Sequence, residues 1–151
     1  MLSSAMSVFR TSIRVRYAET DQMGVVYYAN YFVWFEVGRV ELLRQLGFEY
    51  KQMELADDCH IAVVDASCRY KSPARYDDQL IIETRVLALR RSVLKFGYRI
   101  LRYDGGEHAA PRVLAEGETV HVVVNRQIVK AALPRKYADA IGRFMAIPSA
   151  D

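Results

Sequence analysis

The chain has 151 residues, of which 52% are hydrophobic and 26% are charged, and its formal net charge is +3. This length fits one domain with a single hydrophobic core. The small excess of basic residues argues against the extended cationic surface with which a nucleic-acid-binding domain holds its ligand. The composition is that of an ordinary globular protein, and it allows either an enzyme or a binding module.

The two cysteines, Cys59 and Cys68, lack the Cys-x-x-Cys spacing and the nearby histidine pair of a zinc site. They do not indicate a disulfide framework either. The first seven residues lack both a basic stretch and a sustained apolar run, and no later run is long enough to cross a bilayer. We therefore expect a cytoplasmic protein with one domain over residues 1–151, of which residues 1–7 form a flexible N-terminus.

Apolar and polar residues alternate from Val8 to Ala18, which is the pattern of a strand with one buried face. A helix of about four turns follows, because Asn30 is suited to cap its start and Gly47 to end it. Apolar residues recur at helical spacing and also occur on other sides of this helix. We therefore expect it to be covered over much of its circumference.

Four later segments are rich in β-branched and aromatic residues and are separated by turn residues. They are Ile61–Tyr70, Gln79–Leu89, Ser92–Arg102 and Arg112–Asn125. The short connections between these strands favour an antiparallel sheet. A closing helix is predicted after Leu133, with Pro134 at its first position. A sheet curled around the long helix buries the apolar surface of both, which predicts an α+β domain.

The junction between the first strand and the long helix is the segment Asp21-Gln22-Met23-Gly24-Val25-Val26-Tyr27-Tyr28-Ala29-Asn30-Tyr31. Backbone N–H groups at a helix start have no partner within the helix, and they attract negative charge. A carboxylate beside them suits acyl transfer, with Asp21 activating water or attacking the carbonyl and amides near Tyr28 stabilising the oxyanion. A simpler interpretation is that Asp21 is a loop or capping acid that holds the turn.

This segment resembles the signature of the 4-hydroxybenzoyl-CoA thioesterase-like family of hot-dog fold acyl-CoA thioesterases. The resemblance continues in Cys68-Arg69-Tyr70-Lys71-Ser72-Pro73-Ala74-Arg75-Tyr76-Asp77-Asp78 and in Arg90-Arg91-Ser92. It implies a hot-dog fold, in which an antiparallel sheet of about five strands wraps round one long central helix. Hot-dog folds also host dehydratases and non-catalytic acyl binders, so the fold alone does not name the reaction.

The resemblance implies an acyl-CoA thioesterase that hydrolyses a thioester to a carboxylic acid and coenzyme A. The catalytic groups it implies are Asp21, as general base or nucleophile, and the backbone N–H of Tyr28, with no metal and no cofactor. Tyr28 stands where many relatives have a histidine, which matches the subgroup that relies on the aspartate alone. A thiol pKa of about 8.5 makes the thiolate a good leaving group, so strong general-acid help is unnecessary.

The motifs also imply a set of substrate-binding residues, namely Gly24, Val25, Tyr27, Asn30, Tyr31, Arg90, Arg91 and Ser92. Arg90 and Arg91 are assigned to the phosphates of coenzyme A, and Ser92 to the route toward the acid. The alternative for the two arginines is that they are solvated turn residues. The aromatic residues at the helix start form either an acyl pocket or part of the core or of a subunit interface.

Two neighbouring acids compete with Asp21 for a place in the cleft. Glu19 lies nearer the end of the first strand, where we expect a solvated or ion-paired role. Glu36 lies on the long helix, and we expect it to meet an arginine at a subunit contact.

A single hot-dog unit leaves a sheet edge exposed, and the family joins two units into a continuous sheet with the active sites between subunits. We therefore expect a homodimer that assembles into a homotetramer, with an acyl-CoA or acyl-carrier-protein thioester as substrate. Two alternatives are a thioesterase for acyl-carrier protein in a lipid or polyketide pathway and a non-catalytic acyl-CoA-binding protein. Preference for the carrier-bound substrate identifies the first, and tight binding without turnover identifies the second.

Overall fold

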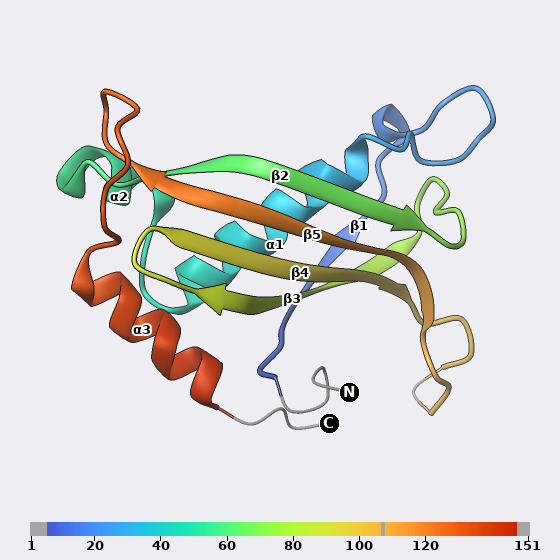
Figure 1. Ribbon diagram of the computed structural model, residues 1–151. Helices are drawn as coiled ribbons and strands as arrows, with labels where there is room; N and C mark the ends of the chain where they lie inside the picture. The colour runs from blue at the N-terminus through green and yellow to red at the C-terminus, as the bar shows by residue number, and fades with distance from the viewer. Residues whose placement is uncertain (1–5, 107, 148–151) are drawn as a thin grey trace.

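The computed structural model describes residues 6–106 and 108–147. In this part of the chain, five antiparallel strands form one curled sheet in the order β1-β3-β4-β5-β2, and the long helix α1 packs against one face (Figure 1). The strands are β1 (Phe9–Arg14), β2 (His60–Tyr70), β3 (Gln79–Leu89), β4 (Val93–Arg102) and β5 (Arg112–Val124). The helices are the 3-10 turn η2 (Tyr17–Glu19), α1 (Asn30–Gln45), α2 (Tyr50–Asp57) and α3 (Arg135–Ala146). The predicted α+β class is confirmed.

Most of the predicted flexible N-terminus, residues 1–5, lies outside the described residues. Ser7 is described, and it is buried, with its hydroxyl donating a hydrogen bond to the carbonyl oxygen of Ile147. None of the helices in the described ranges has the length and apolar character needed to cross a membrane.

The long helix packs against the sheet along one stripe, formed by Tyr31, Trp34, Phe35, Gly38, Arg39, Leu42 and Leu43. Two glycines allow the close approach. A Cβ on Gly38 would lie 2.4 Å from the Thr84 hydroxyl oxygen, and a Cβ on Gly117 would lie 2.4 Å from the Phe35 ring. The opposite side of α1 is open, since Val33 is 51% exposed. Beyond the stripe, Phe32, Val37 and Leu46 are partly buried against the core, so the helix is covered over more than one side, as expected, and the open part lies around Val33.

The predicted cap at Asn30 is wrong. Asn30 is the first residue of α1, the N-cap is Ala29, and no side chain caps the helix. The Asn30 side-chain amide instead donates a hydrogen bond to the carbonyl oxygen of Glu19, at 2.9 Å. The end of the helix is as expected, because Gly47 follows it with a φ of +96°, a conformation that favours glycine.

Two other boundaries and one helix differ from the sequence prediction by more than the placement of a strand end by one residue. The first strand ends at Arg14 and not at Ala18, because the chain turns into η2 at Tyr17. Pro134 is the N-cap of α3 and not its first residue. The helix α2 was not predicted, since its pattern of mixed polar residues carries little apolar periodicity.

A polar chain runs along the buried face of the sheet. The Tyr98 hydroxyl lies 2.6 Å from the Thr119 hydroxyl, which lies 2.8 Å from Nε2 of His121. His121 is fully buried, and its ring meets the Phe96 ring edge to face at 5.3 Å. Burial, with the charge of Arg39 as a smaller cause, lowers the pKa of His121 to about 4. The imidazole is therefore neutral in the folded protein near pH 7.

This buried histidine predicts a loss of stability in mild acid. Below pH 6.5 the unfolded chain protonates His121 while the folded protein does not, so the unfolding free energy falls until the pH reaches about 4. The slope from this group is about 1.4 kcal/mol per pH unit. Urea unfolding across this range should show a shallower decline for His121→Gln than for the wild type, with His108→Gln, at an exposed loop residue, as the control. Parallel curves for wild type and His121→Gln would contradict the prediction.

Candidate active site

The loop between η2 and α1 carries the predicted catalytic acid, and it lies at the upper right end of the sheet in Figure 1. The Asp21 N–H donates to the carbonyl oxygen of Val25 at 2.9 Å, and the Gly24 N–H donates to the carbonyl oxygen of Asp21 at 2.9 Å. Gly24 adopts a φ of +80°, which suits glycine in this tight turn. The Asp21 Oδ1 accepts a hydrogen bond from the Met23 N–H at 2.8 Å. One carboxylate oxygen is thus held by the turn, and Oδ2 forms no hydrogen bond with the described residues.

Asp21 lines a pocket of about 400 Å³ at this end of the sheet. The other lining residues come from the loop, from the start of α1 and from the end of β2 with the turn after it. They are Val25, Val26, Tyr27, Tyr28, Tyr31, Tyr70, Lys71, Ser72 and Pro73. Asp21 is the one carboxylate among these residues, so it is the candidate base or nucleophile of the pocket.

The peptide groups at the start of α1 are anchored by their carbonyl oxygens. The Tyr27 carbonyl accepts from the Asn30 N–H at 2.9 Å, and the Tyr28 carbonyl accepts from the Tyr70 hydroxyl at 2.9 Å. The N–H groups of Tyr28 and Ala29 donate to none of the described residues. Since the C=O and N–H of a trans peptide point in opposite directions, the anchored carbonyls leave these two donors free for a ligand.

The tyrosines of the pocket pack on one another. The rings of Tyr31 and Tyr70 meet edge to face at 5.1 Å, and those of Tyr27 and Tyr28 lie 4.8 Å apart. Burial raises the pKa of Tyr31 and of Tyr70 above the usual value of 10. The Tyr28 hydroxyl raises the pKa of Tyr27. The Tyr27, Tyr31 and Tyr70 phenols therefore stay protonated near neutral pH, and they form an apolar wall.

The other predicted site residues divide into two groups. Val25, Tyr27, Tyr28 and Tyr31 line the pocket together with Asp21, while Gly24 and Asn30 shape the loop without lining it. Arg90, Arg91 and Ser92 belong to the β3–β4 connection, at the left end of the sheet in Figure 1.

The two ends of the sheet are far apart within one chain. The first residue of β3, Gln79, pairs with Arg14 just before the site loop, and Arg90 follows the last residue of β3. Eleven residues of strand span roughly 35 Å. Ser92 is buried, and its carbonyl oxygen accepts from the Val123 N–H at 2.9 Å. A single chain therefore does not bring the predicted phosphate-binding residues to the acid.

One wall of the pocket, formed by Tyr70, Lys71, Ser72 and Pro73, was not predicted from the sequence. These residues lie at the end of β2, about forty positions from the motif at the helix start. The sequence did carry one signal for them. They belong to the second segment that resembles the family, and this segment begins at the end of a predicted strand, as the first one does. The pairing of Val25 with Arg75 and the hydrogen bond from the Val26 N–H to the Ala74 carbonyl oxygen, at 2.8 Å, bring this turn to the site loop.

The two competing acids differ from Asp21. Glu19 is 6% exposed, which corrects the expectation of a solvated role, although its carboxylate does lie 3.5 Å from the Arg16 guanidinium. Glu36 is exposed on α1, and it lies 3.8 Å from Arg39 of the same helix. Neither acid lines the pocket of Asp21.

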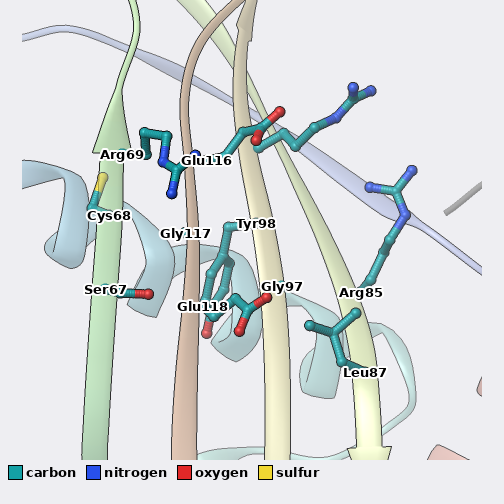
Figure 2. Close-up of a pocket in the computed structure, with 11 residues that line it drawn as sticks. Ser67, Cys68, Arg69, Arg85, Leu87, Gly97, Tyr98, Glu116, Gly117 and Glu118 are labelled. Carbon is teal, nitrogen blue, oxygen red and sulfur yellow. The ribbon is translucent and has the colours of Figure 1, made fainter. Parts of the chain in front are cut away.

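A larger hollow, of about 640 Å³, lies on the face of the sheet that points away from α1 (Figure 2). Its two acids already have cationic partners. Glu116 lies 3.3 Å from Lys71, and Glu118 lies 3.0 Å from Lys95. This hollow offers no acid beside free amides, so it is not the candidate site. No group of three metal-ligating side chains occurs within residues 6–106 and 108–147.

Comparison with known proteins identifies the family of this chain. Residues 23–109 match the thioesterase superfamily. The acyl-CoA thioester hydrolase YbgC of Escherichia coli is 35% identical over 130 residues, which cover 85% of this chain and 92% of that protein. The structure of a DHNA-CoA thioesterase from Staphylococcus aureus is 29% identical, with a TM-score of 0.83 and coverage of 92% of this chain and 91% of that chain.

The 4-hydroxybenzoyl-CoA thioesterase of Pseudomonas sp. strain CBS-3 has the same fold, with a TM-score of 0.78 at 19% identity over 89% of this chain and 99% of that chain. The fold and enzyme class expected from the sequence are thereby confirmed, and the expected acyl-CoA thioesterase activity is the one that its named relatives carry. The segment that matches the superfamily, residues 23–109, includes the free amides of Tyr28 and Ala29, the pocket walls at the start of α1 and the end of β2, and the strands β2, β3 and β4. The chain belongs to the thioesterase superfamily.

Proposed function

We propose that the chain hydrolyses an acyl-CoA thioester to a carboxylic acid and coenzyme A, with Asp21 as the general base or the nucleophile. The observation that carries this proposal is the pairing of one pocket carboxylate with free N–H groups at the start of α1. A tetrahedral intermediate of acyl transfer needs both, a group that activates the attack and donors for the oxyanion.

In this mechanism the thioester carbonyl oxygen accepts hydrogen bonds from the Tyr28 and Ala29 N–H groups. Asp21 takes a proton from a water molecule, whose oxygen attacks the carbonyl carbon. The intermediate collapses with cleavage of the C–S bond, and the leaving thiolate takes up the proton from Asp21. In the nucleophilic variant the Asp21 carboxylate attacks the carbonyl carbon, the C–S bond breaks and the coenzyme A thiolate leaves; water then hydrolyses the resulting anhydride, which gives the carboxylic acid and restores the Asp21 carboxylate. The loss of one oxyanion donor typically raises the barrier by about 3 kcal/mol.

The acyl group would lie against the aromatic wall of the pocket. Tyr27, Tyr31 and Tyr70 supply most of its apolar surface, and Val25 closes one side. A protonated phenol cannot act as the base, which leaves this role to Asp21. The wall accepts either an aliphatic or an aromatic acyl group.

We infer that two copies of the chain form a homodimer through their β2 edges. The two edges of the sheet differ, because β1 is short and carries the arginines Arg10 and Arg14, whereas β2 has eleven residues. On β2, Val63 is 50% exposed and Val64 is 58% exposed. A long apolar edge of this kind invites pairing with a second strand, while charge protects the short one. The unpartnered side of α1 lies open to a second copy as well.

This dimer would also give Arg90 and Arg91 their role. Antiparallel pairing of two β2 strands turns the second chain around, so its β3–β4 turn reaches the end of the assembly that holds the Asp21 pocket of the first. The phosphates of coenzyme A would then meet the partner's Arg90 and Arg91. Pairing of two such dimers through other surfaces would give the homotetramer.

The β2 edge predicts the effect of a charge placed on it. Val64→Asp should lower the solution mass measured by light scattering from that of a dimer or tetramer to that of a monomer, because a carboxylate opposes strand pairing at this edge. Hydrolysis should fall with it, while circular dichroism stays unchanged. The control is Ser12→Asp on the opposite edge strand. An unchanged mass for Val64→Asp would contradict assembly through β2.

The substrate class is tested by measuring hydrolysis rates for a panel of aliphatic and aromatic acyl-CoAs and for the same acyl groups on acyl-carrier protein. Turnover of the free coenzyme A esters supports the proposal. A strong preference for the carrier, with no effect of Arg90→Ala, would replace it with a carrier-protein thioesterase. Tight binding of acyl-CoA without turnover would make the protein a non-catalytic binder.

We also infer a cytoplasmic location. The two thiols, Cys59 and Cys68, are both free, which suits a reducing compartment.

A further inference from the structure

Glu19, two residues before the proposed catalytic acid, is a buried carboxylate with no assigned function. Its Oε2 accepts a hydrogen bond from the Trp34 indole N–H at 3.0 Å, and its Oε1 accepts from the Arg16 backbone N–H at 2.7 Å. The Arg16 guanidinium lies 3.5 Å away, on a side chain that is 75% exposed. Burying a charge is costly unless its oxygens are satisfied, and here each oxygen has a donor.

The backbone of Glu19 is tied to the same region. Its carbonyl oxygen accepts from the Tyr27 N–H at 2.9 Å and from the Asn30 side-chain amide at 2.9 Å. One residue therefore connects the end of the first strand, the far side of the site loop and the first two turns of α1. These contacts hold both ends of the loop that carries Asp21. At its far end, the hydrogen bond from the Tyr27 N–H lies one residue before the free N–H of Tyr28.

We propose that Glu19 is a positioning residue that sets the distance between the Asp21 carboxylate and the free amides at the start of α1. This inference rests on the proposed hydrolysis. Glu19 lines no part of the pocket and does not contact the substrate. It acts through the loop, because the four hydrogen bonds fix both ends of the segment between Asp21 and Tyr28.

The contact with Trp34 extends this role to the pocket wall. Trp34 is 2% exposed, and its ring meets the Tyr31 ring at 5.0 Å. Tyr31 lines the pocket with Asp21. A carboxylate that holds the indole N–H therefore also fixes the ring against which this tyrosine rests.

The site requires a carboxylate and not an amide. Both donors, the indole N–H and the Arg16 N–H, point at Glu19, and a carboxylate accepts at both oxygens. Glutamine of the same shape has one acceptor and one NH₂ group, so one donor would face another donor. The loop must then shift to relieve this contact. A displacement of about 1 Å at reacting groups can lower a rate by about 100-fold.

The test compares kcat and KM of Glu19→Gln with those of the wild type on one acyl-CoA ester. We expect kcat to fall by about 10- to 100-fold and KM to change less than about threefold, since most pocket walls belong to other segments. Trp34 is the only tryptophan of the chain, so its fluorescence reports the contact directly. The emission should shift in Glu19→Gln. Asp139→Asn, at an exposed residue of α3, is the control and should leave all three quantities unchanged.

A wild-type kcat in folded Glu19→Gln would overturn the inference, and so would equal changes in kcat and in the folded fraction. If this variant does not fold, Trp34→Phe removes one donor while leaving the carboxylate and its Arg16 contact, and it should lower kcat with little change in KM. The proposed function fails separately, since it requires Asp21→Asn to lower kcat by about 1,000-fold. Such a loss in Asp21→Asn together with a fully active Glu19→Gln would refute only the positioning role.

Discussion

Asp21→Asn is expected to lower kcat for acyl-CoA hydrolysis by about 1,000-fold, within the range of 10² to 10⁴ that a positioned acid or base contributes. The amide can neither take a proton from water nor attack the carbonyl. The KM should change little, because the aromatic wall and the free amides stay in place. The rates are measured by release of the coenzyme A thiol.

The substitution conserves the turn, which separates the chemistry from the fold. Asn keeps the side-chain oxygen that accepts from the Met23 N–H, so the melting temperature should stay near that of the wild type. Asp139→Asn serves as the matched control on the surface of α3. Equal kcat values for Asp21→Asn and the wild type would exclude the proposed role of the acid.

The same residue allows the two chemical routes to be distinguished. A single turnover in water labelled with heavy oxygen leaves the label in the Asp21 carboxylate only if this carboxylate has formed an anhydride with the acyl group. Direct attack by water places the label in the released acid alone. Mass spectrometry of the peptide containing Asp21 reads the result.

The largest effect on stability is expected at Glu83, a carboxylate on β3 that is 1% exposed. Its oxygens lie 2.9 Å from Arg10, 2.9 Å from Arg99 and 3.4 Å from Arg85. Arg10 and Arg99 sit directly opposite Glu83 on the two neighbouring strands. Breaking a buried ion pair by removal of one partner typically costs 3–5 kcal/mol. Here the charge left buried without compensation is that of Arg85, whose side chain is 10% exposed, whereas Arg10 and Arg99 are more than a third exposed, so the loss falls at the lower end of this range. We therefore expect Glu83→Gln to lower the unfolding free energy by about 3 kcal/mol.

This loss corresponds to a melting temperature roughly 10 °C lower for a domain of this size. The matched control is Glu118→Gln on the same face of the sheet. Glu118 lies 3.0 Å from Lys95, but its side chain is half exposed, and such pairs contribute less than about 1 kcal/mol. Thermal and urea unfolding measure both variants. Equal losses in the two would show that burial of Glu83 does not set its contribution.

Much of the fold followed from local patterns. Alternation predicted the first strand, and β-branched and aromatic residues between turn residues predicted the other four, with the bounds of β3 exact. The predicted first strand was longer than β1, because the alternation of apolar and polar residues continues through Tyr17, where the backbone already turns into η2. The helix α2 was missed because its eight residues bury little, with Met53 as its one buried residue.

The candidate site also has a part that could be predicted from the sequence and a part that could not. The resemblance in the segment from Asp21 to Tyr31 pointed to the candidate acid, the candidate amides and every tyrosine of the pocket except Tyr70, all of which lie close together in the chain. Tyr70 was not assigned, because its contact with Tyr28 joins residues that are 42 positions apart. The buried role of Glu19 was also missed. A carboxylate near a strand end is usually solvated, and only the packing of Trp34 against the loop removes it from water.

The sequence by itself determined the α+β class and the strand-to-helix junction and pointed to Asp21 as the candidate acid, because each depends on residues within a few turns or one strand of each other. The tertiary structure alone decided which groups meet. It brought the turn after β2 to the pocket, and it buried the carboxylates of Glu19 and Glu83. It also separated Arg90 and Arg91 from the acid by the length of β3. The physical reason is that strand order and register set contacts between distant residues, and no local pattern encodes either.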